Sequence, residues 1–483
     1  MGFAPLVENR TLYFLGIKGS GMASLAILAK RAGAKVGGCD SPEVFPTDHQ
    51  LAQEGIVWQT WNAALLPSEA DFVIHSAAYK PDSHPLLLQA AQAGKSIYSY
   101  PEFLALISQH ADCYGIAGTH GKTTSVGCVS SILQPTGIPF FSLYGASLQK
   151  PTTQTVLTGA EVGILEACEY QDHFLLYNLK GLLVTNIELD HPDYFLDIEA
   201  VHASFQKSTA RLPTGGFLVC GTDSEKSKAL AAWARNSRPD LVVVTFGTGR
   251  GNDFRMHDYE RNQKESSFQL DPLEGYFFSR LAGEPLCLDI VGASILSACI
   301  ILSQAGRLDM NTLETDPVLP ALLHEAASFS GCTGRMEVMA EESGVVFVDD
   351  YAHHPTEIAV TMESLRQQFP GRRLVVVFCP HTRSRTLTLY DGFVRTLSLA
   401  DVLVVQDIYA SARKDGLADS QPSVAGRLAL DAGGLFAPDD ATVLSILRDV
   451  LQEDDLCITM GAGNNRGLSA LAANQRRSDA CGV

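Results

Sequence analysis

Short apolar runs alternate along the chain with stretches in which apolar residues recur every three or four positions, a pattern typical of alternating strands and helices. The first unit, "TLYFLGIKGSGMASLAILAKRAGAKVGGCD", occupies residues 11–40. It predicts a strand, a glycine-rich turn, an amphipathic helix and a second strand that ends at Asp40. A third apolar run follows at 71–78, and a strand with a helix at 95–107. We therefore expect a small, doubly wound, Rossmann-like domain at 1–110.

Two further units repeat this alternation. Near-continuous apolar runs, as expected of parallel strands covered on both faces, recur up to residue 247, whereas 251–290 lacks that rhythm. The last unit opens with "GVVFVDDYAHHPTEIAVTMESLRQQF" at 344–369. The chain is thus expected to be α/β, with three consecutive domains at 1–110, 111–330 and 331–483, the last again Rossmann-like.

The middle unit carries a phosphate-binding pattern. Residues 113–129, "CYGIAGTHGKTTSVGCV", read as a strand, a turn and a helix around Gly-Lys-Thr, although the usual pattern has a glycine where Ile116 stands. Lys122 would reach the terminal phosphoryl oxygens and the Thr123 hydroxyl would bind Mg²⁺. We predict a central P-loop ATPase domain. Its expected ATP-binding residues are Gly118, Thr119, His120, Gly121, Lys122, Thr123 and Thr124.

Two acidic strand ends follow the phosphate loop. Glu166 ends the apolar run in "GILEACEY", and Asp190-His191 follows the run in "GLLVTNIELDH". Ligands of open parallel sheets bind beyond the carboxyl ends of the strands. A carboxylate suits Mg²⁺, whereas a histidine is an unusual ligand for it and His191 is equally well explained as a structural residue. The predicted Mg²⁺ ligands are Thr123, Glu166 and His191.

The glycine turn of the first unit leaves its ligand open. Gly16, Gly19 and Gly21 have the spacing G-x-x-G-x-G, which differs from the G-x-G-x-x-G of dinucleotide folds, and Asp40 lies where a ribose-binding acid would. The turn either only packs or binds a pyrophosphate at the following helix N-terminus. The pattern alone does not distinguish NAD from a UDP-sugar.

Polar residues also gather at two strand ends of the last unit. "VDDYAHHPTE" contains Tyr351 and His353, and "CPHTRSRT" contains His381, Arg383 and Arg385. Arginines at such a position suit recognition of a carboxylate or a phosphate. The alternatives are capping of the next helix and a solvated loop.

Composition narrows the function classes. The 483 residues carry a formal charge of −18, which argues against nucleic acid or an anionic membrane as a partner. The 11 cysteines lack C-x-x-C spacing, as expected of reduced thiols in a cytoplasmic protein. The N-terminus lacks the apolar core of a signal peptide, and no apolar run is expected to reach the eighteen residues of a membrane helix.

Six motifs in order resemble those of the ATP-dependent Mur ligases of peptidoglycan precursor synthesis. They are "FLGIKGSGMASLA", "GTHGKTTS", "EACEYQDHFL", "TNIELDHPDYF", "DDYAHHPTE" and "PHTRSRT". The resemblance is to the alanine-adding branch, and the shorter T-x-G-K-T loop of this family accounts for Ile116. It implies a UDP-sugar-binding first domain, a central ATPase and a third domain that receives the amino acid. The implied substrates are ATP, UDP-N-acetylmuramic acid and L-alanine, which react through an acyl phosphate, with Mg²⁺ as cofactor and a monomer or weak homodimer as the working form.

The resemblance also assigns residues to roles. The implied catalytic residues are Lys122, Glu166, His191, His353 and Arg385. The implied substrate-binding residues are Gly19, Ser20, Gly21, Met22, Asp40, Tyr351, His381 and Arg385.

This sequence departs from the family at several positions. Ser294 and Ser297 stand near the place of an asparagine pair that contacts adenine, and Gln206 falls at the position of a lysine that related ligases carry carbamoylated. Three alternatives stay open: a recycling ligase that adds a tripeptide to the same sugar nucleotide, a nicotinamide-dependent dehydrogenase, and a non-catalytic nucleotide-binding protein.

Overall fold

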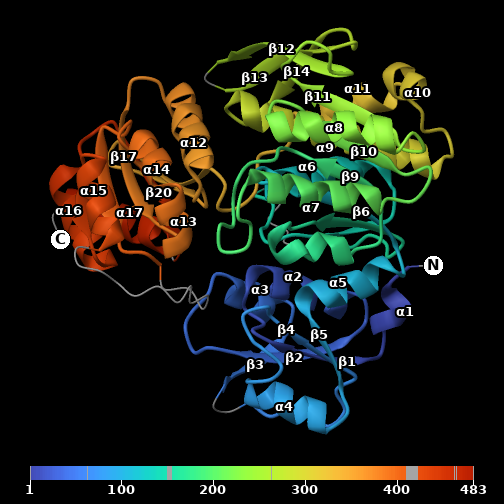
Figure 1. Ribbon diagram of the computed structural model, residues 1–483. Helices are drawn as coiled ribbons and strands as arrows, with labels where there is room; N and C mark the ends of the chain where they lie inside the picture. Colours follow the sequence, from blue (N-terminus) through green and yellow to red (C-terminus); the bar gives the residue numbers. More distant parts are fainter. Residues whose placement is uncertain are drawn as a thin grey trace.

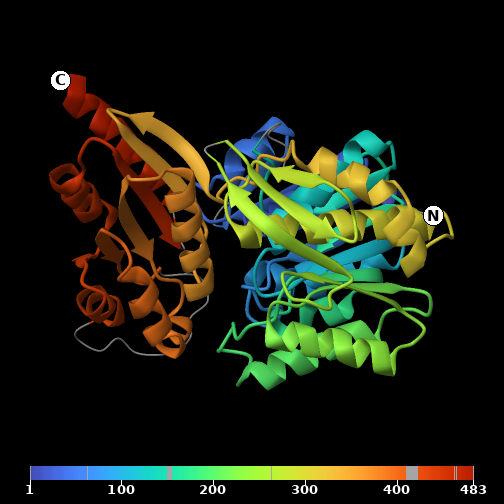
Figure 2. The ribbon, with the colours of Figure 1, turned by 90° about the horizontal axis from the view of Figure 1, so that it is seen from above.

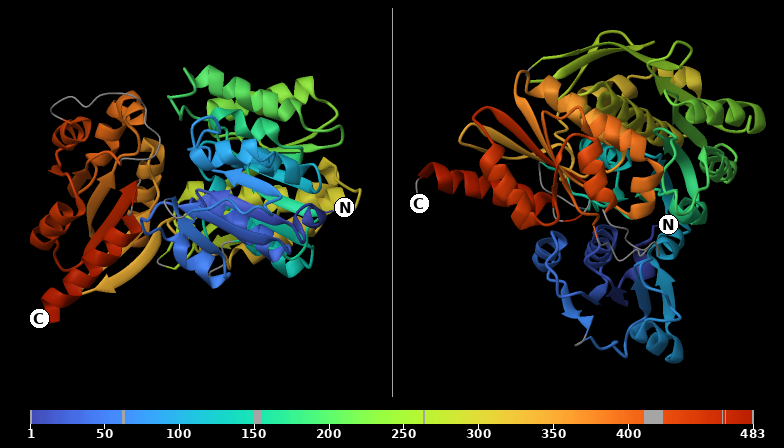
Figure 3. Two further views of the ribbon diagram at one scale, coloured as in Figure 1. Left: turned by 90° about the horizontal axis from the view of Figure 1, so that it is seen from below. Right: turned by 60° about the vertical axis from the view of Figure 1, so that its left-hand side comes forward.

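The computed structural model describes residues 2–61, 64–149, 155–262, 264–409, 423–461, 463 and 465–481. It contains three sheets, each flanked by helices (Figure 1). The expected fold class, three α/β domains in series, is confirmed. The third domain stands beside the middle one in the view from above (Figure 2), and α17 (Asn465–Cys481) carries the C-terminus away from the rest (Figure 3).

The first sheet has five parallel strands in the order β3-β2-β1-β4-β5. Its strands are β1 (Thr11–Leu15), β2 (Lys35–Asp40), β3 (Val57–Thr60), β4 (Phe72–His75) and β5 (Ser96–Ser99). Its helices are α1 (Ala4–Val7), α2 (Ser20–Arg31), α3 (Thr47–Gln53), α4 (Pro85–Gln92) and α5 (Tyr100–Ser108). The glycine turn predicted from the sequence joins β1 to α2, at the carboxyl edge of this sheet.

The second sheet has nine strands in the order β14-β13-β12-β11-β10-β9-β6-β8-β7, and only the hairpins β12-β13-β14 are antiparallel. Its strands are β6 (Asp112–Ala117), β7 (Phe140–Leu143), β8 (Val162–Glu166), β9 (Leu179–Val184), β10 (Phe217–Gly221), β11 (Val242–Gly247), β12 (Phe254–Arg261), β13 (Ser266–Asp271) and β14 (Tyr276–Ser279). Its helices are α6 (Lys122–Leu133), η2 (Gln134–Thr136), η3 (Tyr170–Leu176), α7 (Ile198–Ala210), α8 (Glu225–Ser237), α9 (Glu284–Gln304), α10 (Met310–Thr315) and α11 (Val318–Ala326). Since β9, β6 and β8 are neighbours, the segments that follow them meet at one edge.

The third sheet has the order β15-β16-β20-β17-β18-β19, with β15 antiparallel and the other strands parallel. Its strands are β15 (Glu337–Glu342), β16 (Val345–Asp350), β17 (Arg373–Cys379), β18 (Val402–Gln406), β19 (Leu435–Ala437) and β20 (Asp455–Gly461). Its helices, with α17, are α12 (Pro355–Gln368), α13 (Arg383–Thr388), α14 (Tyr390–Leu397), α15 (Val424–Asp431) and α16 (Asp440–Val450).

Helix α9 corrects one expectation from the sequence. Among the described residues it alone is long and apolar enough to cross a membrane by length and composition. The expectation that no apolar run reaches eighteen residues was therefore wrong. The most apolar part of α9 is 78% buried inside the structure, where the helix packs against α6 and α11. Burial on all sides explains an apolar helix without an amphipathic pattern.

The apolar cores show how the domains are joined. One continuous cluster of buried side chains runs from the first domain into the middle one, and Phe3 contacts Phe141 across this boundary with ring centroids 4.5 Å apart. The buried clusters of the third domain contain only residues of that domain, within the described part of the chain. The first two domains thus share a core, whereas the third has its own.

Candidate active site

The phosphate loop lies between β6 and α6. Gly118 and Gly121 have φ values of +134° and +83°, which glycine adopts readily. A Cβ atom on Gly118 would lie 2.0 Å from Thr185 Oγ1, and one on Gly121 would lie 2.2 Å from Asp289 Oδ1. Both positions therefore require glycine. Gly121 is the N-cap of α6, whose first amides have no partner within the helix and suit an anion.

Lys122 is held back toward its own loop. Its Nζ donates hydrogen bonds to the Gly118 and Thr119 carbonyls and to Glu169, whose oxygens lie 3.1 and 3.2 Å away. Burial lowers the pKa of Lys122, but the Glu169 carboxylate outweighs this and raises it above the ordinary value. Lys122 is therefore a cation at the loop. Glu169 is a site residue that the sequence analysis missed, although it stands only three positions after Glu166.

Thr123 and Glu166, two of the three predicted Mg²⁺ ligands, lie together. The Thr123 hydroxyl is 3.3 Å from both carboxylate oxygens of Glu166, whose Oε2 also accepts a 3.4 Å hydrogen bond from the Gly145 amide. The third predicted ligand is His191. Its ring packs on the Tyr170 ring with centroids 4.6 Å apart, and its φ is +54°. A hydroxyl and a carboxylate in contact form a hard-oxygen pair of the type that Mg²⁺ prefers.

The glycine turn of the first domain lies close to Gly145, whose amide contacts Glu166. A Cβ atom on Gly145 would lie 3.2 Å from Ser20 Oγ, so the turn approaches the segment that contacts Glu166. Asp40 is buried, and its Oδ2 accepts the Lys18 amide at 2.7 Å. Gly19 is the N-cap of α2. The remaining predicted residues of the turn differ in environment: Gly21 lies against the Tyr100 ring and Met22 is buried.

The structure also brings together the predicted residues of the third domain. The ring of His353 lies 5.0 Å from that of Tyr351 and 6.0 Å from that of His381, and Arg385 Nη1 donates to His381 Nδ1 at 3.2 Å. The other two nitrogens of Arg385, Nε and Nη2, donate to the two carboxylate oxygens of Asp190 in the middle domain, at 2.7 and 3.0 Å. The Arg385 fork, expected to bind a substrate carboxylate, is thus paired with Asp190 in this conformation.

A cavity of about 880 Å³ lies between the middle and third domains. Its walls include the phosphate loop, the end of β11, the start of α9 and the start of α12. Asp289 of α9 lines the cavity, and burial raises the pKa of its carboxyl group to about 7 while His120 and Arg335 oppose this. The volume is that of a site for a drug-sized or nucleotide-sized molecule.

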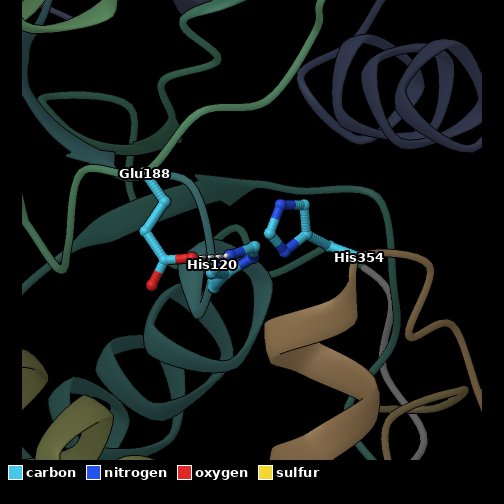
Figure 4. A group of neighbouring side chains, drawn as sticks. All are labelled: His120, Glu188 and His354. Carbon is cyan, nitrogen blue, oxygen red and sulfur yellow. Dashed lines mark hydrogen bonds and ion pairs between the residues drawn. The ribbon is translucent and has the colours of Figure 1, made fainter. Parts of the chain in front are cut away.

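His120, Glu188 and His354 form a group whose ligand atoms lie within 4.8 Å of one another (Figure 4). His120 Nδ1 is 3.1 Å from Glu357 and Nε2 is 3.4 Å from Glu188. Burial lowers the pKa of His120, but these two carboxylates raise it to about 9. His354 accepts from the Thr356 amide and donates to the Leu189 carbonyl, so its ring nitrogens are engaged. The hydrogen bonds therefore describe a charged network, and a metal ion would have to displace them.

All three domains match models of known protein families. Residues 11–111 match the "Mur ligase family, catalytic domain", 116–294 the "Mur ligase middle domain" and 334–463 the "Mur ligase, glutamate ligase domain". The chain is 34% identical over 472 residues to the UDP-N-acetylmuramate–L-alanine ligase of Treponema pallidum (strain Nichols), covering 97% of each chain.

This chain belongs to the Mur ligase family.

Other Mur ligases agree with this assignment. The UDP-N-acetylmuramate–L-alanine ligase of Desulfitobacterium hafniense is 32% identical over 461 residues, covering 94% of this chain and 97% of the relative. The crystal structure of UDP-N-acetylmuramate-alanine ligase from Thermotoga maritima shares the fold with a TM-score of 0.75 at 20% identity, covering 97% and 99% of the two chains. A murein peptide ligase from Psychrobacter arcticus shares it with a TM-score of 0.68 at 18% identity, with the same coverage.

The departures from the Mur ligase motifs lie away from the cavity surface. Ser294 and Ser297 of α9 are fully buried, and the Ser297 hydroxyl donates to the Ala293 carbonyl at 2.8 Å. Asp289, earlier in the same helix, lines the cavity instead. Asp289 was not predicted as a site residue from the sequence, although a carboxylate within an otherwise apolar helix is a signal that could have identified it.

Proposed function

We propose that this Mur ligase joins L-alanine to UDP-N-acetylmuramic acid at the expense of ATP. The observation that carries the proposal is the 34% identity over 97% of the chain to a relative with that name. The site supports it, because the cavity between the middle and third domains is lined by His120, Gly121 and Thr124 of the phosphate loop and by Thr356 and Glu357 at the start of α12.

The reaction needs two displacements. A carboxylate oxygen of the sugar nucleotide attacks the γ-phosphorus of ATP, and ADP leaves. The alanine amine then attacks the carbonyl carbon of the acyl phosphate, inorganic phosphate leaves, and the amine loses a proton. The first step is required because an oxide ion is a poor leaving group. Both steps develop negative charge on phosphoryl oxygens, which cations stabilise.

The phosphate loop supplies the protein's own cation. Until ATP binds, Glu169 would hold the Lys122 ammonium group at the loop. When ATP binds, Lys122 would exchange Glu169 for the terminal phosphoryl oxygens. Thr123 and Glu166 would hold Mg²⁺, and His191 is proposed as a third ligand. When bound, Mg²⁺ would offset charge on the transferring phosphoryl group.

The remaining roles follow the domains. We propose that 1–110 binds the UDP-sugar through residues 19–22 and Asp40, that 111–330 binds ATP, and that 331–483 receives the amino acid. Tyr351, His353, His381 and Arg385 are proposed to contact alanine. We further propose a cytoplasmic monomer or weak homodimer; the charge of −18 supports the absence of nucleic-acid and membrane partners.

The test is release of inorganic phosphate by the purified protein. We expect release only when ATP, Mg²⁺, UDP-N-acetylmuramic acid and L-alanine are all present. The tripeptide L-alanyl-γ-D-glutamyl-meso-diaminopimelate replaces alanine in a parallel reaction. Faster turnover with the tripeptide would reassign the protein as a recycling ligase. If neither acceptor supports phosphate release, the protein would be reassigned as a non-catalytic nucleotide-binding homologue.

A further inference from the structure

Polar contacts hold the third domain against the middle one. The Thr356 hydroxyl donates to Glu188 at 2.7 Å, the His354 ring donates to the Leu189 carbonyl at 3.2 Å, and Arg385 pairs with Asp190. Three consecutive residues of the middle domain thus receive three groups of the third. Domain interfaces of this polar kind are suited to relative motion, unlike the shared apolar core of the first two domains.

His120 connects this interface to the phosphate loop. Its backbone belongs to the loop and its amide donates to Asn186 Oδ1 at 3.0 Å. Its side chain, 12% exposed, lies between Glu188 of the middle domain and Glu357 of the third. The same Glu357 accepts the amides of His353 and His354 at 3.0 and 3.3 Å, which orders the start of α12. One carboxylate therefore contacts both the phosphate loop and the segment that carries His353.

We propose that His120 is a positioning residue that couples the phosphate loop to docking of the third domain, with Glu357 as its partner. The proposal rests on the nucleotide-binding part of the proposed function and is independent of which amino acid is used. His120 acts through Glu357, which places His353 and its neighbours, and nucleotide held by the loop would favour the docked arrangement.

The charges around His120 determine how docking depends on pH. Facing its ring are the carboxylates of Glu188, Glu357 and Asp289 and the neutral ring of His354, whose pKa burial and His120 lower to about 4. In the docked structure the pKa of His120 is about 9, and undocking removes Glu357 and so lowers it. The contribution of the His120–Glu357 pair to docking is therefore fully present below the pKa of undocked His120 and is lost as the pH rises through about 9.

The substitution Glu357→Gln removes the negative charge that faces His120, His353 and Arg335, and the double variant with His120→Gln separates the part that acts through His120. Glutamine keeps a side-chain oxygen for the two α12 amides, as in other capping boxes, but offers no negative charge to His120. The matched control is Glu363→Gln, because Glu363 is an exposed acid on the same helix. Small-angle scattering measures compactness between pH 7 and pH 10 in the presence of Mg²⁺ and adenylyl imidodiphosphate, and steady-state assays give kcat and the KM values.

Wild type and Glu363→Gln should be compact at pH 7 and expand near pH 9. Glu357→Gln should be more expanded than wild type at pH 7, because its docking equilibrium should be about tenfold weaker. Its compactness should not change near pH 9. Its kcat should fall, and its KM for ATP should rise by up to about tenfold, because docking and nucleotide binding are coupled reciprocally. The double variant His120→Gln/Glu357→Gln should be no worse than its more impaired parent.

Other outcomes would overturn the coupling. If Glu357→Gln is as compact as wild type at pH 7 and also expands near pH 9, docking does not depend on His120. Additive losses in the double variant would likewise show that the two residues act independently. A protein that lacks ligase activity but shows the predicted scattering would support the coupling while refuting the proposed reaction.

Discussion

Replacing Arg385 with lysine tests the proposed amino-acid site. Arg385 is 5% exposed and bonds Asp190 through two donors, while a third donor reaches His381. Removing one partner of such a buried pair costs about 3–5 kcal/mol, whereas lysine keeps the charge and one hydrogen bond. The substitution therefore removes directional recognition while largely retaining the electrostatic contact.

The expected magnitude follows from the lost hydrogen bond. A hydrogen bond to a charged group contributes about 1.5–3 kcal/mol, which corresponds to a change of about 10- to 150-fold in an equilibrium constant. We expect Arg385→Lys to raise KM for alanine by at least about tenfold and KM for ATP by less than about twofold. Initial rates of phosphate release, with each substrate varied in turn, give both values.

Asp190→Asn separates substrate binding from docking. Asparagine weakens the pair but leaves the Arg385 guanidinium available to a substrate carboxylate. If Arg385 binds alanine, this variant should lose kcat while its KM for alanine rises much less than in Arg385→Lys. Equal increases in KM for both substrates in Arg385→Lys would refute the proposed site. An Asp190→Asn variant with the same alanine KM as Arg385→Lys would show that Arg385 acts only through Asp190.

Three further predictions concern phosphate transfer, metal and selectivity. Lys122→Ala should lower kcat by about 160- to 5,000-fold with an unchanged circular-dichroism spectrum, since a lost charge at the transition state costs about 3–5 kcal/mol; near-normal turnover would refute the ATP site. Glu166→Gln and His191→Ala should each raise the Mg²⁺ concentration for half-maximal rate, and an unchanged requirement in either variant would make that residue structural. Glycine and serine should react at least about tenfold less efficiently than alanine, and leucine should not react. The Tyr351→Ala variant should accept leucine. Efficient use of leucine by the wild type would place the amino-acid pocket elsewhere.

Local patterns made much of the fold predictable. The phosphate loop is set by a strand, two glycines that must adopt positive φ and a helix start, all within residues 112–124. The glycine turn after β1 and the polar ends of β8, β9 and β16 were predictable in the same way, because strand ends of parallel sheets meet at one edge. What these predictions need is the order of neighbouring residues, which the sequence shows directly.

Contacts between domains were not predictable by this reasoning. Asp190 was recognised as an acidic strand end, but its partner Arg385 lies 195 positions away, and His120 and Glu357 are separated by 237. Likewise, Glu169 follows a predicted strand end, but nothing in the sequence indicates that its carboxylate pairs with the Lys122 ammonium group. Pairings of this kind depend on how three separately formed sheets are oriented, and no periodicity in the chain reports that orientation.

The distribution of apolar and polar contacts connects the fold to the order of events. The first two domains share a buried core, so the glycine turn and the Thr123–Glu166 pair keep a fixed relation. The third domain, which is proposed to bind the amino acid, contacts the middle domain through ion pairs and hydrogen bonds, which water can replace at small net cost. Under the proposed function, this arrangement would allow the carboxylate of the sugar nucleotide and ATP to assemble on a rigid surface, and the amine to be presented only when the third domain docks. An acyl phosphate formed there would be shielded from hydrolysis by the same movement that presents the amine.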